Sequence, residues 1–175
     1  MKKTIFTEEE CSYLKSFYNV EEEIDGSSPQ EVTRDDGSTF YIRYRKKNHL
    51  TFCTIYNEEV NNFLTNKLQE YKVKKVDSFK IMKYLTGDAL APHYDLGGYG
   101  YEGNYMTISI MLSDGTEYTG GDLIVEGVYK SREIGSVSSF LRTEKHEVTE
   151  VLSGERMSLV IFLRKDQVHI ETTLI

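Results

Sequence analysis

The sequence lacks long hydrophobic runs and has few cysteines. No apolar stretch is long enough to cross a membrane. Three consecutive acids, Glu8 to Glu10, arrive before any apolar signal-peptide core can form, so we expect no secretory signal. Cys11 and Cys53 are too few and too isolated for a disulfide framework, which favours a reducing, cytoplasmic setting.

Positive charge is outnumbered, with 21 Lys and Arg against 28 Asp and Glu. The formal net charge of −7 disfavours binding to nucleic acid through neutralisation of phosphates. A local basic patch can act alone, and one is present at residues 43–47, which we interpret as the solvated face of a strand.

The first 75 residues predict two helices and some strand. Thr7 and Glu10 have the spacing of a capping box, so a helix should follow them. A second helix is expected to start near Asn57. Residues 21–39 are polar and glycine-bearing, which favours a loop or loose hairpin, and residues 40–45 alternate enough to form a strand.

From Val76 onward, short apolar stretches alternate with glycine-bearing turns. This spacing favours a β-sandwich or jelly roll over alternating βαβ units. The expected fold is mainly β with α, a double-stranded β-helix (jelly roll) buttressed by N-terminal helices. We expect one domain over residues 1–175, with 76–165 as its core and 1–75 as helical and strand support. The predicted strands are 79–85, 105–112, 122–125, 137–141, 148–152 and 157–163.

His93 and Asp95 form a candidate pair of metal ligands. Two positions apart on an extended segment, they project to the same face. Two imidazoles and one carboxylate, arranged facially, leave three open positions on Fe(II). The pair alone is a weak signal, because four histidines and 28 acids in 175 residues give 4 × 28/175 ≈ 0.6 such pairs by chance. A rival pair, His169 and Glu171, is interpreted as part of an ordinary terminal strand.

Further candidates lie downstream. His146 follows His93 by 146 − 93 = 53 residues, and Arg156 and Ser158 come next. On a strand these last two share a face, where a guanidinium and a hydroxyl can clamp a carboxylate. Apolar neighbours at 157 and 159–162 predict that Arg156 is partly buried and needs an anionic partner.

Three pairs of motifs run in order through this half of the chain. They resemble the 2-oxoglutarate/Fe(II) dioxygenase superfamily, and within it the prolyl 4-hydroxylase-like branch. The first pair, Tyr84–Asp88 with Pro92–Asp95, is similar to the Tyr-x-x-Gly segment that leads into His-x-Asp. The second, Thr107–Ser113 with Tyr118–Leu123, is similar to a strand and a Gly-Gly-(Asp/Glu)-Leu turn. The third, Lys145–Val148 with Gly154–Ser158, is similar to the distal histidine and the basic 2-oxoglutarate anchor.

The resemblance implies 2-oxoglutarate as cosubstrate, bound by Arg156 with help from Ser158 and the hydroxyl of Tyr84. In this family a second tyrosine often contacts the cosubstrate, and the corresponding position here is Met111 or a neighbour. Ascorbate is a further cofactor that the resemblance leaves open. The implied iron ligands, which are also the catalytic residues, are His93, Asp95 and His146.

The expected function is hydroxylation of a C–H bond by a non-haem Fe(II), 2-oxoglutarate-dependent dioxygenase. The resemblance favours a prolyl residue of a peptide or protein as substrate, while a free amino acid, another small molecule or a nucleobase stays open. One rival is a non-catalytic jelly-roll binding module, which leaves the buried Arg156 unexplained. Another is a zinc hydrolase with the same three ligands, which gives 2-oxoglutarate no role.

Two glycine-bearing segments complete the predictions. Gly120 and Gly121 are expected to form a tight turn that needs positive φ, with Asp122 as a cap or a solvated charge. Residues 97–103 follow the first two ligands and are rich in glycine and tyrosine. Two interpretations of that loop stay open, a lid that contacts substrate and a long strand connection.

Overall fold

A computed structural model describes residues 4–25, 30–33, 35–42, 50–95 and 104–170. The basic patch at 43–47 and the loop at 97–103 therefore lie outside the described residues. None of the helices in the described ranges is long and apolar enough to cross a membrane. The helical elements are α1 (Glu8–Lys15), η1 (Val20–Glu22), α2 (Glu58–Lys67), η2 (Gln69–Tyr71) and η4 (Lys165–Gln167).

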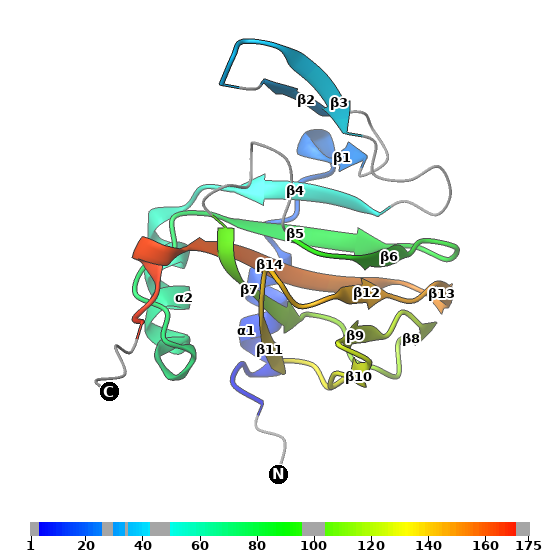
Figure 1. The fold of residues 1–175 in the computed structure, drawn as a ribbon. Coiled ribbons are helices and arrows are strands. Elements are labelled where there is room, and N and C mark those ends of the chain that lie inside the picture. Colours follow the sequence, from blue (N-terminus) through cyan, green and yellow to red (C-terminus); the bar gives the residue numbers. More distant parts are fainter. Residues whose placement is uncertain (1–3, 26–29, 34, 43–49, 96–103, 171–175) are drawn as a thin grey trace.

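The centre of the fold is a six-stranded antiparallel sheet, whose long strands cross the whole molecule (Figure 1). A four-stranded antiparallel sheet covers one face of it, and two short pairs complete the strands. The large sheet has the order β1 (Ile24–Asp25), β4 (Thr51–Ile55), β5 (Phe79–Tyr84), β14 (Arg156–Arg164), β7 (Asn104–Met111) and β11 (Val137–Leu141). The small sheet has the order β10 (Val128–Tyr129), β9 (Leu123–Val125), β12 (His146–Val148) and β6 (Leu90–His93). The pairs are β13 (Val151–Gly154) with β8 (Tyr118–Gly120), and β2 (Gln30–Thr33) with β3 (Thr39–Ile42).

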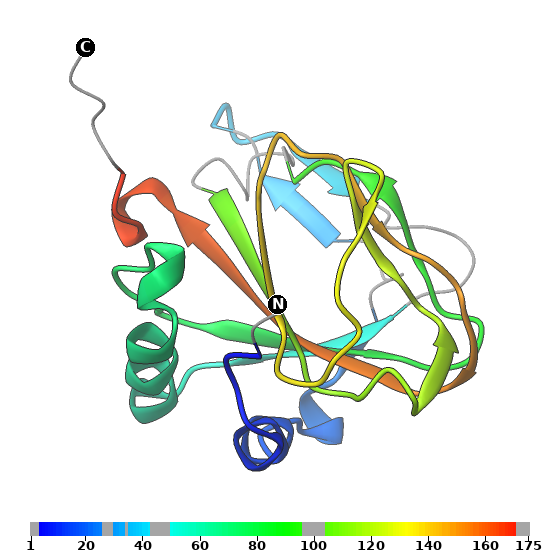
Figure 2. The same cartoon turned by 90° about the horizontal axis from the view of Figure 1, so that it is seen from below.

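Both helices cover the other face of the large sheet (Figure 2). The first begins as predicted, because Thr7 accepts from the backbone N–H of Glu10 and the Glu10 carboxylate accepts from that of Thr7. The second is capped by Asn57, whose side chain accepts from the Val60 N–H. The predicted jelly roll with helical buttresses is confirmed.

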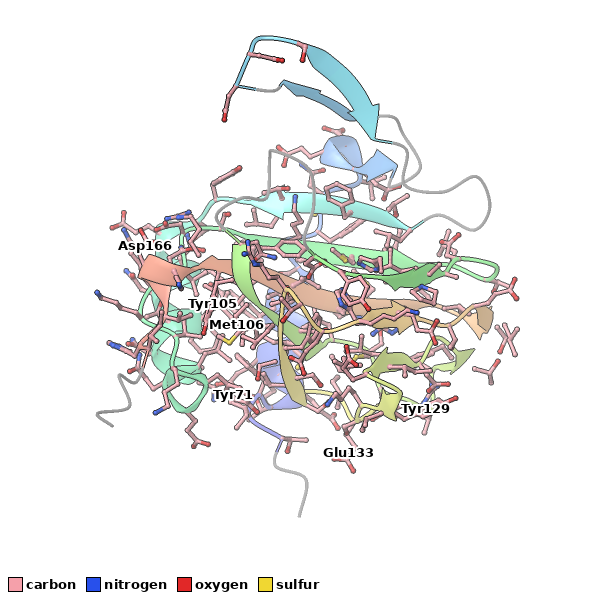
Figure 3. The ribbon with its side chains drawn as sticks, in the orientation of Figure 1. Tyr71, Tyr105, Met106, Tyr129, Glu133 and Asp166 are labelled. Atoms are coloured by element: carbon pink, nitrogen blue, oxygen red, sulfur yellow. The ribbon has the colours of Figure 1, made fainter. Side chains whose placement is uncertain are left out.

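Alternation along β14 divides the large sheet into two chemically different faces. Its odd positions join a helix-side cluster, and its even positions face the small sheet. Because the cluster is apolar and almost fully buried, it supplies the main hydrophobic core. Tyr71, Tyr105 and Met106 pack against its margin (Figure 3). The helix-side cluster includes Cys11, Leu14, Val60, Leu64, Phe79, Ile81, Ile108, Ile110, Met157, Leu159, Ile161 and Leu163.

Two predictions of strand position need correction, and some strands were not predicted. The stretch 148–152 is not one strand but the end of β12 and the start of β13, because Glu150 O accepts from Gly121 N and Thr149 from Asp122 N, which bends the chain between sheets. The predicted terminal strand is wrong at His169 and Ile170, since η4 turns the chain and only Val168 forms an isolated bridge, with Val73. Strands β4, β6, β8 and β10 were not predicted.

The predicted glycine turn is present between β8 and β9. Gly120 and Gly121 have φ of 68° and 64°, in the region that L-residues with a Cβ avoid. A Cβ on Gly120 would also overlap the Glu150 carbonyl oxygen, whereas one on Gly127, at φ 76°, would meet nothing within 4 Å. A side chain at Gly127 would meet backbone strain alone, whereas one at Gly120 would meet both strain and steric overlap.

We expect Gly120→Ala to destabilise the fold by at least about 3 kcal/mol, because strain and overlap act together. Gly127→Ala should cost about 1 kcal/mol, the cost of the left-handed conformation alone. Urea unfolding of both variants measures the difference. Equal losses would mean that the turn at Gly120 shifts freely, contrary to the packing described.

Candidate metal centre

Three predicted ligands converge where β6 meets β12. The antiparallel register places His146 directly opposite His93, with ring centroids 4.2 Å apart. Asp95 follows two residues after His93, and its Oδ1 lies 3.5 Å from His93 Nε2 and 3.3 Å from His146 Nε2. One donor atom from each residue lies within 4.8 Å of the others. The structure therefore brings together a set of three donors suited to one divalent ion.

Backbone carbonyls hold both imidazoles in the orientation that a metal site needs. His93 Nδ1 lies 2.7 Å from Ala91 O, and His146 Nδ1 lies 3.0 Å from Glu144 O. A carbonyl oxygen only accepts, so Nδ1 must carry the proton in each ring. The Nε2 lone pairs are left facing Asp95, ready for coordination.

The Asp95 side chain is only 10% exposed, yet its surroundings favour the ionised form. Its Oδ2 accepts a hydrogen bond of 2.7 Å from Thr107 on β7, which turns Oδ1 toward the two histidines. Burial raises the pKa of Asp95, but the neighbouring His146 and His93 rings and the hydrogen bond from Thr107 outweigh it and hold that pKa below its usual range. For His146, burial lowers the pKa, but the Asp95 carboxylate opposes this and the net pKa is raised. An ionised carboxylate is the form that binds a cation.

Apolar side chains shield this centre from one side. His146 is only 5% exposed, and the Phe140 ring packs against it with centroids 4.4 Å apart. Leu123 and Val148 of the small sheet line the same cavity as the three ligands. Such a wall limits the access of water to the donors.

Arg156 lies in the cavity that the three ligands line. Its side chain is 1% exposed, and no carboxylate pairs with it in the described part of the chain. Its contacts are the Ser158 hydroxyl at 3.3 Å and the Met111 sulfur at 3.5 Å, and its Nε has no hydrogen-bond partner. The sequence predicted partial burial, and the burial is in fact almost complete. An uncompensated buried cation is costly, so this position favours an anionic ligand.

Tyr84 completes the basic end of the cavity. It pairs with Arg156 in register, and the guanidinium carbon lies 5.0 Å from the centre of its ring. Burial raises the pKa of Tyr84 to about 12, although Arg156 opposes the shift. The phenol therefore keeps its proton at neutral pH and can donate it in a hydrogen bond.

Sequence reasoning missed three contributors to the site. Thr107 orients Asp95, Phe140 covers His146, and Gly121 lets the chain approach Arg156, since a Cβ there would lie 3.1 Å from the Arg156 Cδ. Alternation along residues 105–112 could have marked Thr107 as a polar residue on the inner face. The other two depend on contacts between distant segments.

Two remaining candidates have structural contacts. Asp122 forms an ion pair with Arg132, which also donates to the carbonyls of Gly120 and Tyr118, so its charge helps to hold the glycine turn. Met111 contacts Arg156 where the second tyrosine was sought, and offers sulfur in place of a hydroxyl.

A larger hollow of about 590 Å³ lies at the other end of β7 and β14. Tyr105 and Asp166 line it (Figure 3), together with Arg142 and Arg164. It contains none of the predicted site residues, and Arg164 is already paired with Asp77 and Asp166. The smaller cavity beside the three ligands is therefore the better candidate site.

Comparisons with known proteins agree with the sequence motifs. No family model matches the chain. A PKHD-type hydroxylase of Maricaulis maris is 28% identical over 95 residues, which are 52% of this chain and 43% of the relative. Another, of Prochlorococcus marinus, is 30% identical over 91 residues, 50% of this chain and 41% of the relative. The chain thus spans less than half the length of these relatives.

Solved structures show the same fold at low identity. The viral collagen prolyl hydroxylase of Paramecium bursaria Chlorella virus 1 superposes with a TM-score of 0.62 at 15% identity, over 93% of each chain. A 2OG-Fe(II) oxygenase family oxidoreductase of Burkholderia pseudomallei gives 0.59 at 15% identity, over 94% of this chain and 83% of the other. The predicted likeness to the 2-oxoglutarate/Fe(II) dioxygenases, and to their prolyl 4-hydroxylase-like branch, is confirmed.

We expect Thr107→Val to weaken divalent-metal binding at least tenfold, because Asp95 loses the hydrogen bond that orients it. The substitution keeps the side-chain shape, and anaerobic calorimetric titration with a divalent ion measures the affinity. Thr119→Val is the matched control, since its exposed hydroxyl is hydrogen-bonded to Ser153, away from the three ligands. Equal affinities in all three proteins would show that Thr107 does not support the ligand.

Proposed function

We propose that the chain is a non-haem Fe(II), 2-oxoglutarate-dependent dioxygenase that hydroxylates a C–H bond, with a prolyl residue of a peptide or protein as the favoured substrate. One observation carries the proposal. A cluster of His93, Asp95 and His146 shares a cavity with a buried Arg156 that has no acidic partner in the described ranges. The three donors suit a cation, and Arg156, in the same cavity, suits an anion.

The donor set fits Fe(II). Two neutral imidazole nitrogens and one carboxylate oxygen offer three ligands from one side, which leaves room for further ligands on the ion. When bound, the iron supplies the oxidative chemistry, in which oxygen and 2-oxoglutarate are consumed, succinate and carbon dioxide form, and a substrate C–H bond becomes C–OH. The contribution of the chain is to hold, orient and shield.

Arg156 is the proposed anchor for the far carboxylate of 2-oxoglutarate. Its planar fork suits a carboxylate, and its unpartnered Nε gives a further reason for a ligand at this position. The Ser158 hydroxyl at 3.3 Å and the protonated Tyr84 phenol supply additional donors beside it. Binding of a dicarboxylate would offset the desolvation of the guanidinium.

The geometry favours this chemistry over the two rivals. A zinc hydrolase needs a general base for water, but Asp95 is the only acidic residue among those that line the cavity in the described ranges, and it serves as a ligand. A non-catalytic binding module gives no reason for two imidazoles whose Nε2 atoms both face one carboxylate.

The finer parts of the proposal concern substrate and setting. The prolyl substrate is supported by the motifs and by relatives named as PKHD-type hydroxylases. Ascorbate, as a reductant for the iron, and a cytoplasmic setting are part of the proposal, and the buried free thiols of Cys11 and Cys53 are compatible with a reducing compartment. Oxygen-dependent succinate formation across a panel of prolyl peptides, free amino acids and oligonucleotides tests substrate class directly.

We expect His93→Ala and Asp95→Ala each to abolish Fe(II)-dependent formation of succinate from 2-oxoglutarate, because two donors hold the ion too weakly. Anaerobic iron binding and aerobic succinate assays measure the two effects. His169→Ala is the matched control, because His169 is exposed and is not among the residues that line the cavity. Succinate at the wild-type rate in either ligand variant would exclude the proposed centre.

We expect Arg156→Met to raise the apparent KM for 2-oxoglutarate at least tenfold, equivalent to about 1.4 kcal/mol. Stability without ligand should be unchanged or higher, because a buried cation is replaced by an apolar side chain of similar length. Initial rates and urea unfolding separate the two effects. Arg164→Met, at an exposed position on the same strand, should leave the KM unchanged. An unchanged KM in Arg156→Met would place the anchor elsewhere.

A further inference from the structure

One strand of the large sheet carries two lysines on opposite faces. On β5, Phe79 and Ile81 point into the helix-side cluster, whereas Met82 and Tyr84 line the cavity. Lys80 has the parity of Met82 and Tyr84 and therefore faces the interior of the sandwich. Since lysine seldom faces such an interior, the position needs a chemical reason.

Lys80 is not itself among the residues that line the cavity, but the register places it beside one that is. Lys80 pairs with Val160 on β14, and Val160 pairs in turn with Ser109 on β7. Val160 and Ser109 both line the cavity. Strands lie about 4.8 Å apart, so the Cα atoms of Lys80 and Ser109 are separated by about 10 Å. Thr107, which holds Asp95, is the next inward residue on β7. The Lys80 ammonium itself lies on the other side of β5, toward Thr54 on β4.

The ammonium group of Lys80 has polar and aromatic contacts but no acid. Its Nζ donates to Thr54 Oγ1 at 2.9 Å and lies 4.6 Å from the centre of the Phe52 ring. No carboxylate pairs with it in the described ranges, whereas Lys83, on the outer face, pairs with Glu23 at 2.9 Å. Burial lowers the pKa of Lys80, because the charged ammonium loses part of its hydration. An ammonium has three donors, and Thr54 takes one.

The formal charges of the site leave one cation unmatched. A divalent ion, Arg156 and Lys80 together carry four positive charges, and Asp95 removes one. The two carboxylates of 2-oxoglutarate remove two more. One positive charge remains. Since Arg156 is already assigned to the cosubstrate, Lys80 is the cation that lacks a counter-charge.

We propose that Lys80 recognises a carboxylate of the substrate, so that the preferred substrate carries an acidic group close to the carbon that is hydroxylated. The inference rests on the proposed function and adds the chemical class of the substrate. Two sources share this chemistry, an acidic residue beside the target in a peptide and the α-carboxylate of a free amino acid. Thr54 and Phe52 position the ammonium and leave donors for the incoming oxygens.

The test uses ligand pairs that differ only in one charge. Acetylated and amidated prolyl peptides with Glu or Gln beside the proline form one arm, and L-proline with L-prolinamide forms the other. Calorimetry under anaerobic conditions, with Fe(II) and 2-oxoglutarate present, measures binding without turnover, and mass spectrometry in air measures hydroxylation. We expect the wild-type protein to prefer the carboxylate member of at least one pair tenfold or more, and the arm that shows it identifies the source.

Three variants assign that preference to Lys80. Lys80→Met should reduce the ratio to near one, Lys80→Arg should keep it, and Lys80→Glu should favour a matched peptide with lysine in place of glutamate. Lys83→Met removes the same charge from the outer face and should leave the ratio unchanged. Unfolding midpoints check that each variant is folded, and Lys80→Arg preserves the test if Lys80→Met is unstable.

The outcomes separate this inference from the proposed function. If no pair shows a carboxylate preference in the wild-type protein, including the case of no binding, the inference is overturned. It is also overturned if Lys80→Met keeps the preference. Wild-type formation of succinate without added substrate reports on the dioxygenase function alone, so its presence beside a failed preference counts only against Lys80.

Discussion

The pairing of β6 with β12 is the constraint on which the candidate site depends. It sets His146 opposite His93 and brings Asp95 within hydrogen-bonding reach of both rings. Carbonyl oxygens of Ala91 and Glu144 then fix which ring nitrogen carries hydrogen. Without that register, residues 53 positions apart in the chain would have no reason to share a ligand. The rest of the sandwich supports this pairing of β6 with β12.

The large sheet keeps the chemistry apart from the hydrophobic core. On the helix side its residues are apolar and closely packed, and on the other side the same strands present Arg156, Ser158, Ser109 and Thr107. Burying so many polar groups costs stability, which the helix-side cluster must supply. The two N-terminal helices are therefore a condition for a polar interior, although they contribute nothing to the lining of the cavity in the described ranges.

The sequence predicted the site more completely than the path of the chain. His93, Asp95, His146, Arg156 and Ser158 were predicted because alternation along a strand and ordered motifs depend on local sequence. Thr107 and Phe140 were not, because their roles come from contacts across the sandwich.

The errors in strand position have the same origin. Residues 148–152 have the composition of one strand, but hydrogen bonds from Gly121 and Asp122 divide it between two sheets. The terminal segment near His169 has strand-like composition but lacks a neighbouring strand edge in the described ranges. In both segments, strand formation depends on pairing with residues distant in the chain, and local composition does not reveal those partners.

The alternation along β14 has a consequence for how such a protein changes over time. Met157, Leu159 and Ile161 pack in the core on the helix side, and the residues between them line the cavity. Neighbouring residues of one strand therefore contribute to two different properties, the packing of the core and the binding of ligands. Substitutions at the cavity-facing positions can therefore change specificity, while the core-facing positions preserve the scaffold that keeps each variant folded.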